Sequence, residues 1–408
     1  MEEKRKCKIL YFSLSDEMRR EEKLEWFRDT KFEDIDFERI RPDEKGNWLN
    51  ITDNDFDSLI PVCSKETKLG KGGHAIFGLY TSTIKTNRDE WVFDYDKNTL
   101  IQKIKFFIEK YNQQIESNLT HNNDLDYSIK WSRDLKNKLY KKRKIVFNEN
   151  LIFKIPSRPF LKQFWYAEKI LNDVLTENHY LISGNNFDLE NVMINFSGVG
   201  MIKPPQFLVS RQIPDYSILE ATQCLPLYRY EKGEKVENIT DWALELFEKR
   251  YGSVEEGGLS IEDRDLSVGN TLPSTLHPRI SKQDIFHYVY AVLHDPKYRT
   301  KYAQNLKRDF PKIPLYSDFW KWANAGKKLM DLHLNYEKIE ERVLRVEDRG
   351  SSGVSRKENR ENTTLNTLAP RSKLKANKEL GEIYIDEQTT LTGVPPLAWE
   401  YKLGNRSA

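Results

Sequence analysis

Two short loops in this chain carry side chains that suit hydrogen bonding to the edges of DNA bases. Arg158 lies in Ser-Arg-Pro-Phe and Arg211 in Val-Ser-Arg-Gln, each at the end of a predicted strand. An arginine can donate two hydrogen bonds to guanine, and a glutamine such as Gln212 can pair similarly with adenine. Loops on a rigid β scaffold are a common place for such side chains. We therefore predict Arg158, Arg211 and Gln212 as candidate base contacts.

Further cations suit the binding of phosphate groups, which adds affinity without sequence preference because counterions are released. Residues 136–144 hold six Lys or Arg in nine positions, and a second set lines a turn between predicted helices near residue 300. A solvated helix face explains either set equally well. A cation and a carboxylate also flank the turn at 85–89, where a structural Arg–Asp pair is the alternative. The additional cations predicted at a DNA surface are Lys85, Arg88, Lys141, Lys142, Arg143, Lys162, Arg299, Lys307 and Arg308.

The motifs of several catalytic classes are missing from the sequence. An amino-methyltransferase needs Asn or Asp before Pro-Pro-aromatic, and the nearest match, residues 203–207, has lysine before Pro-Pro. The sequence has no GxxxxGK[ST] phosphate loop, and a tight turn explains the Gly-x-Gly at 198–200. The seven histidines are scattered and form no HExxH. We predict no catalytic residue, no metal ligand and no cofactor in this chain.

Composition limits the class of protein. With 408 residues we expect two or three packed units, and the 9 Trp, 20 Tyr and 20 Phe supply enough aromatic mass for their cores. The net charge is only +2, so any basic surface must be local. The three cysteines form no CxxC pair, which argues against a zinc site or a disulfide framework. Because no apolar run could cross a bilayer or serve as a signal peptide, we expect a soluble cytoplasmic protein.

The pattern of apolar residues predicts an α+β protein. Helical spacing indicates a helix over 99–112, and further helices near 241–251 and over most of 281–345. Within 286–337 we expect two amphipathic helices flanking a basic turn, then a third helix after Lys-Ile-Pro. Runs of β-branched and apolar residues predict strands over 8–14, 75–86, 91–95, 145–155, 179–185, 192–202 and 206–213, and a hairpin over 381–395.

Two stretches near the ends of the chain lead to further expectations. The strand at 8–14 is expected to be buried, and Leu24, Trp26 and Phe27 are expected to contact a core from the helix that follows it. Residues 349–380 contain almost no large apolar side chain, so we expect this stretch to be mobile.

Five stretches of the chain, in order, resemble the C-terminal specificity region of type ISP single-polypeptide restriction–modification enzymes. The most distinctive is 286–337, which reads FHYVYAVLHDPKYRTKYAQNLKRDFPKIPLYSDFWKWANAGKKLMDLHLNYE. The others are 8–27, 85–112, 155–166 and 197–231. Together these stretches cover most of residues 8–345.

The resemblance implies that the chain recognises a DNA target, because members of this family find their site with this region. It also implies that a nuclease, a helicase-like motor and an adenine methyltransferase lie upstream, with their S-adenosylmethionine, ATP and Mg²⁺. Met1 lies a few residues before the segment that follows the methyltransferase core, so we expect either a split enzyme or a truncated remnant. A protein-interaction scaffold that does not bind DNA is the alternative from another class.

The expected architecture is an irregular β-rich target-recognition module braced by a helical bundle. Its expected partner is double-stranded DNA. In a split enzyme, a separate methyltransferase or helicase–nuclease polypeptide would be a second partner. No interaction with a membrane is expected. The expected segments are 1–74, which would follow and pack on a methyltransferase core, 75–280 as the recognition module, 281–345 as the helical module, 346–380 as a flexible linker, and 381–408 as a C-terminal hairpin.

Overall fold

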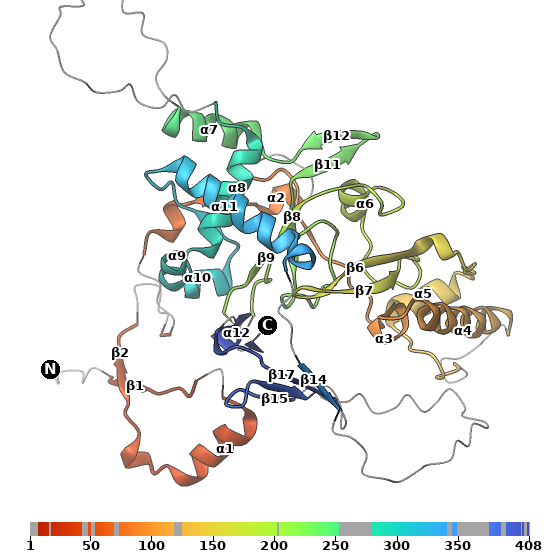
Figure 1. Ribbon diagram of the computed structural model, residues 1–408, viewed down its shortest axis with the longest axis horizontal. Coiled ribbons are helices and arrows are strands. Elements are labelled where there is room, and N and C mark those ends of the chain that lie inside the picture. The colour runs from red at the N-terminus through yellow and green to blue at the C-terminus, as the bar shows by residue number, and fades with distance from the viewer. Residues whose placement is uncertain are drawn as a thin grey trace, which may run out of the picture. The chain divides into compact units, whose positions relative to one another are not determined.

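The protein forms two compact units, Met1–Tyr336 and Glu337–Ala408 (Figure 1). Helices and small antiparallel sheets build both units, which confirms the predicted α+β class. The finer division into five segments stays a prediction. The computed structural model describes residues 7–15, 18–42, 48–49, 54–68, 73–117, 125–201, 204–252, 279–340, 345–348, 375–384, 389–400, 402–403 and 406–407.

Antiparallel sheets form the β part of the first unit. A four-stranded sheet has the order β4-β10-β8-β9, a three-stranded sheet has the order β5-β7-β6, and the ribbons are β1-β2, β13-β3 and β11-β12. The strands are β1 (Ile9–Tyr11), β2 (Glu38–Ile40), β3 (Ile60–Pro61), β4 (Thr81–Ser82), β5 (Phe93–Asp94), β6 (Ile152–Arg158), β7 (Leu161–Tyr166), β8 (Met193–Phe196), β9 (Phe207–Ser210), β10 (Gln223–Pro226), β11 (Tyr228–Glu231), β12 (Glu234–Glu237) and β13 (Lys312–Ile313).

Most of the longer helices of the first unit begin at a polar residue that accepts a hydrogen bond from the first turn. Asp96 caps α4, Ser132 caps α5 and Thr240 caps α7. The helices predicted over 99–112 and near 241–251 are confirmed by α4 and α7. The helices are α1 (Arg20–Asp29), α2 (Lys65–Lys68), α3 (Asp89–Val92), α4 (Lys97–Glu116), α5 (Arg133–Tyr140), α6 (Glu177–Ser183), α7 (Asp241–Tyr251), α8 (Lys282–His294), α9 (Pro296–Lys301), α10 (Ala303–Arg308) and α11 (Phe319–Leu334).

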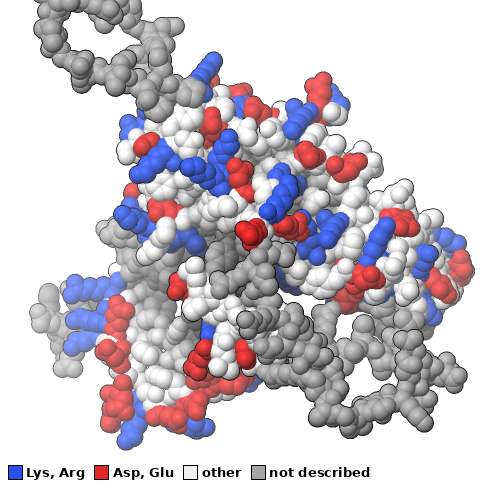
Figure 2. Space-filling view, viewed as in Figure 1, with Lys and Arg blue, Asp and Glu red and all other residues white. Residues whose placement is uncertain are grey.

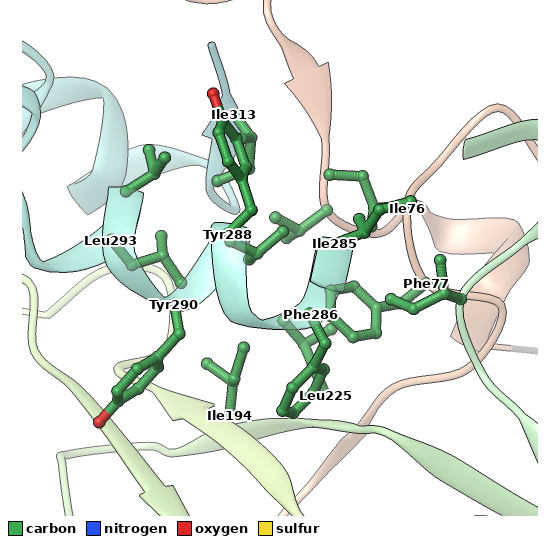
Figure 3. Close-up of a cluster of buried hydrophobic side chains, with 14 of the residues drawn as sticks. Ile76, Phe77, Ile194, Leu225, Ile285, Phe286, Tyr288, Tyr290, Leu293 and Ile313 are labelled. Carbon is green, nitrogen blue, oxygen red and sulfur yellow. The ribbon is translucent and has the colours of Figure 1, made fainter. Parts of the chain in front are cut away.

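Helix α8 lies at the centre of the larger hydrophobic core (Figure 3). Residues 285–293 are all buried, because apolar and aromatic side chains leave the helix on every side. Phe286 packs edge-on against Phe77, with ring centroids 5.9 Å apart, and Ile194 and Leu225 of the four-stranded sheet lie nearby. The prediction of an amphipathic helix here is therefore wrong. The expectation that helices brace the β-rich part is confirmed.

A second core lies between α4 and the three-stranded sheet. Leu100, Ile104 and Phe107 of α4 are fully buried, as is Trp165 of β7. The helix and the strand are in direct contact. This core fixes the β6–β7 hairpin, which carries the candidate base contact Arg158 at its end.

Two segments that were predicted to be strands, 179–185 and 91–95, begin with helical residues in the structure. The segment 179–185 lies mainly in α6, because Thr176 and His179 close the first turn of that helix. The backbone N–H of Thr176 donates to His179 Nδ1 at 3.0 Å. Helix α3 occupies the first residues of the strand predicted over 91–95 and leaves only β5. Aromatic and β-branched content favoured strands in both cases, and for α6 the capping interaction between Thr176 and His179 decided otherwise.

The prediction of a buried strand and a buried helix face near the N-terminus is wrong. Strand β1 is only half-buried, and α1 has no buried residue. Leu24 is 58% exposed and Phe27 is 77% exposed, while Trp26 stacks on Phe12 with ring centroids 5.1 Å apart. The spacing of apolar residues shows which side of a helix is apolar, but it does not show whether another element covers that side.

The second unit contains a sheet with the order β14-β17-β16-β15. Strands β16 and β17 are antiparallel neighbours, which confirms the hairpin predicted over 381–395. The predicted mobile stretch is mostly outside the described residues, but β14 and β15 occupy the two ends of the predicted linker. The elements of this unit are β14 (Arg345–Asp348), β15 (Lys375–Asn377), β16 (Glu382–Tyr384), β17 (Thr389–Thr392), α12 (Pro396–Glu400), β18 (Lys402–Leu403) and β19 (Arg406–Ser407).

None of the helices that the structure describes combines the length and the apolar character needed to cross a membrane.

Candidate nucleic-acid interface

The backbone at the end of β9 presents Arg211 and Gln212 to solvent. Buried Ser210 donates from its hydroxyl to the carbonyl oxygen of Gln212 at 2.8 Å, and buried Asn195 donates to the same hydroxyl at 2.8 Å. The turn is thereby fixed, while both side chains that follow it are exposed. Arg211 has one long contact, with Nη2 lying 3.5 Å from the side-chain oxygen of Asn335.

The turn between β6 and β7 is held by aromatic packing. Phe160 has a φ of 56°, in the left-handed region that few non-glycine residues adopt. Its ring packs edge-on against His333 at 5.6 Å and against Tyr336 at 5.2 Å between centroids. Lys162 places its ammonium 5.7 Å from the centroid of the Tyr336 ring. The packing of Phe160 therefore fixes the hairpin that carries Arg158 and Lys162.

Arg211 and Gln212 lie between two surface hollows. The first hollow has a volume of about 170 Å³ and the second about 370 Å³, and both residues contribute to the wall of each. The first hollow brings the β6–β7 hairpin, the end of β9 and the end of α11 together. Its wall contains Pro156, Phe160, Leu161, Lys162, Leu208, Ser210, His333 and Tyr336. The wall of the second contains Phe153, Phe187, Asp188, Glu190, Asn191, Tyr228 and Lys235.

Arg158 pairs with a carboxylate from a distant part of the chain. Its Nη1 donates to Asp215 Oδ2 at 2.9 Å. The side chain of Asp215 is only 5% exposed, whereas that of Arg158 is 54% exposed. Burial raises the pKa of the Asp215 carboxyl to about 6, with a further contribution from the negative charge of Asp89, while Arg158 acts in the opposite direction.

We expect ionised Asp215 to reduce stability at neutral pH. Because its folded-state pKa, about 6, lies above the unfolded value of about 3.9, the folded protein binds this proton more tightly. The contribution of this group to stability therefore falls as the pH rises through that window. The free energy of unfolding of Asp215→Asn, measured by urea unfolding, is compared with that of the wild type at each pH. The difference should shift in favour of the variant by about 1 kcal/mol between pH ~5 and pH ~7. An identical difference at both pH values would contradict this expectation.

The structure contradicts the prediction that Arg88 faces DNA. Arg88 is fully buried, and its guanidinium donates to Asp173 at 2.8 Å, to Ser132 at 2.7 Å and to the carbonyl oxygen of Leu171. The alternative of a structural Arg–Asp pair is therefore the correct one, although the partner of Arg88 is Asp173 and not the adjacent Asp89. A charge this far from solvent is satisfied within the protein and has no route to a phosphate or a base.

Other predicted cations gather in a separate hollow beside α9 and α10. This hollow has a volume of about 490 Å³, and Arg299 and Lys307 contribute to its wall. Arg299 donates from Nη2 to the carbonyl oxygen of Pro205 at 2.8 Å, and exposed Arg308 donates to that of Leu49 at 3.3 Å. None of these three cations contributes to the walls of the first two hollows.

The remaining predicted cations are spread further. Residues 141–143 are exposed at the end of α5, which lies well apart from α9 and α10 in Figure 1. Lys85 is half-buried, with its ammonium 5.4 Å from the centroid of the Tyr216 ring. Figure 2 shows basic and acidic side chains interspersed over the visible face. Among the described residues, no group of three or more His, Cys, Asp or Glu is arranged to hold a metal ion.

Residues 75–408 match the family described as the type ISP C-terminal specificity domain. This chain belongs to that family. The resemblance predicted from the sequence is therefore confirmed, and the matched residues include every candidate DNA contact named above. No curated protein matches the chain.

Three solved structures are similar to this type ISP specificity domain. A DrdV–DNA complex is 38% identical with a TM-score of 0.74, covering 98% of this chain and 38% of that one. A nuclease-deletion mutant of the type ISP enzyme LlaGI, in complex with a DNA substrate mimic, is 25% identical with a TM-score of 0.69, covering 100% and 34%. The ATP-dependent type ISP enzyme LlaBIII, bound to DNA, is 26% identical with a TM-score of 0.69, covering 91% and 22%. The chain thus spans well under half the length of these three proteins.

Sequence reasoning missed several residues that shape the site of this type ISP specificity domain. Asp215 was not identified as the partner of Arg158, and the aromatic residues Phe153, Tyr228 and Tyr336 were not expected around the base-contact candidates. These residues come from segments that are far apart in the chain. Neither periodicity nor a local motif signals such contacts, so the sequence offered no direct way to find them.

Proposed function

We propose that this chain recognises a specific DNA sequence as the specificity part of a type ISP restriction–modification enzyme. The observation that carries the proposal is the Arg211–Gln212 pair, whose side chains are exposed on a fixed backbone between two hollows. Exposed donors can reach base edges, and a fixed backbone loses little entropy on binding. Family membership and the DNA complexes among the similar structures support the same function.

Sequence-independent affinity would come from the cations outside these hollows. Arg299, Lys307, Arg308 and residues 141–143 would neutralise phosphates at separate points along the duplex. Cleavage, translocation and methyl transfer would belong to other parts of the enzyme, with S-adenosylmethionine, ATP and Mg²⁺, on the same or a separate polypeptide. The chain would act in the cytoplasm, where it meets incoming DNA.

We expect Arg211→Ala to relax the sequence preference at one base position. A bidentate arginine–guanine pair contributes about 1–3 kcal/mol of discrimination, so the preference for that base should fall roughly 5- to 150-fold. The bound sequence is first selected from a random duplex library with the full chain. Fluorescence anisotropy then compares the selected duplex with its single-base variants over a range of salt concentrations.

Arg250→Ala is the matched control, since Arg250 is an exposed arginine on α7 that lies in neither hollow wall. It should leave the preference unchanged. An equal loss of affinity for all sequences in Arg211→Ala would make Arg211 a phosphate contact and remove the main support for the proposal. Failure of the wild-type chain to select any sequence would favour a protein-interaction scaffold instead.

A further inference from the structure

Asp215 holds only one side of the Arg158 guanidinium. Nη1 of Arg158 donates to Asp215 and to the carbonyl oxygen of Ser157. Within the described part of the chain, Nε and Nη2 of Arg158 have no hydrogen-bond partner. With this side chain 54% exposed, one part of the guanidinium is tied to the protein while its Nε–Nη2 edge remains available.

Asp215 is itself held by its surroundings. Its backbone N–H donates to the carbonyl oxygen of Pro156 at 2.9 Å, and its carboxylate accepts a hydrogen bond from the backbone N–H of Ser217. Ile84 forms a parallel bridge to Asp215. Two segments that are distant in sequence, around Ile84 and Pro156, therefore fix the backbone of Asp215, while the neighbouring Ser217 holds its carboxylate. Through this carboxylate they restrict the side chain of Arg158.

The available edge of Arg158 has the geometry needed to read guanine. Guanine presents O6 and N7 side by side in the major groove, and arginine contacts both with two N–H groups. Nε and Nη2 carry two such groups in a rigid planar fork. An arginine that is oriented before binding loses less side-chain entropy when it contacts a base.

The carboxylate also distinguishes between two kinds of DNA contact. A phosphate beside Asp215 would be repelled by the negative charge, which weakens a backbone contact through Arg158. The edge of a guanine carries no net charge and experiences no such repulsion. The geometry points to Asp215 as a positioning residue that orients Arg158 to read a guanine in the recognised sequence. This inference rests on the proposed function.

The test uses the duplex selected by the full wild-type chain, with 7-deazaguanine replacing each guanine in turn. This analogue lacks N7, so the wild type should lose about tenfold in affinity at the guanine that Arg158 reads. Arg158→Ala and Asp215→Ala should each bind the normal and the substituted duplex equally at that position. The double variant should be no worse than either single variant, because the two residues act as one unit.

Several outcomes would overturn the inference. An equal loss of affinity for all duplexes in Asp215→Ala, or effects that add in the double variant, would make the role of Asp215 structural. Asp215→Asn keeps one acceptor oxygen and serves if the alanine variant does not fold. Asp215→Asn should retain part of the preference for guanine over 7-deazaguanine. If it retains the whole preference, the negative charge of Asp215 is not what positions Arg158.

The pattern of results also separates this inference from the proposed function. A wild-type chain that selects no sequence would contradict the proposed function itself. A wild-type chain that selects a sequence, with the preference relaxed by Arg211→Ala but not by Arg158→Ala, would contradict only the inference about Arg158 and Asp215. Arg250→Ala again serves as the control and should keep the full response to 7-deazaguanine.

Discussion

Replacement of Gly326 by alanine is expected to lower the free energy of unfolding by about 3 kcal/mol. Gly326 lies on α11 where this helix contacts α8. A Cβ at this position would lie 1.9 Å from the carbonyl oxygen of His287 and 3.2 Å from the Cβ of Ala291. The obstacle is helical backbone, which cannot rotate away as a flexible side chain can. The two helices must separate, and the core around α8 then loses contacts.

Urea unfolding followed by circular dichroism measures this effect. Asn324→Ala is the control, because Asn324 is exposed on the same helix and alanine is the better helix former. Its free energy of unfolding should stay within about 0.5 kcal/mol of wild type. Equal stability of the Gly326 and Asn324 variants would show that α8 and α11 do not approach as closely as described.

Replacement of Asp173 by alanine is expected to cost about 3 to 5 kcal/mol of stability. The side chain of Arg88 is 0% exposed, and Asp173 is its ion-pair partner at 2.8 Å. Burial lowers the pKa of the Arg88 guanidinium, and the charge of Asp173 opposes this shift. Without Asp173, the buried positive charge loses its ion-pair partner and keeps only the smaller attractions of Asp134 and Glu90. The hydrogen bonds from Asn87 and Ser132 to Asp173 are lost as well.

Two control variants distinguish the cost of leaving the Arg88 charge without its ion-pair partner from the cost of lost packing around Asp173. Glu116→Ala breaks an exposed ion pair with Lys144, at 2.8 Å, and should cost less than about 1 kcal/mol. The double variant Arg88→Met with Asp173→Leu replaces the pair by apolar side chains and should regain most of the loss. If the double variant is as unstable as Asp173→Ala, the cost comes from packing and not from the buried charge.

Elements with a strong local signal were the most predictable part of the fold. Helices α4 and α7 follow from apolar residues at helical spacing after a capping residue, and the β16–β17 hairpin follows from two short apolar runs. Helix α6 shows the limit of this reasoning. Its β-branched and aromatic residues favour a strand, but the interaction between Thr176 and His179 closes a helical turn. Local interactions that compete are hard to rank from sequence alone.

The candidate site was predictable in residue type and only partly in arrangement. Arg158, Arg211 and Gln212 were expected at strand ends in the β-rich part, and the structure places them there with exposed side chains. Arg88 was expected at the same kind of surface, yet it is buried. The sequence around Arg88 shows a turn with charges, and an exposed pair gives the same local pattern as a buried one.

The sequence by itself determined the family, the α+β class and the kinds of side chain available to contact DNA. These depend on residue identity and local spacing, which the chain carries whether or not it is folded. Only the tertiary structure decided which charges are used inside the protein and which face solvent. Arg88 meets Asp173 and Arg158 meets Asp215 across long stretches of chain, because the packing of two cores brings these segments together. Burial and pairing depend on the whole fold, so no local pattern specifies them.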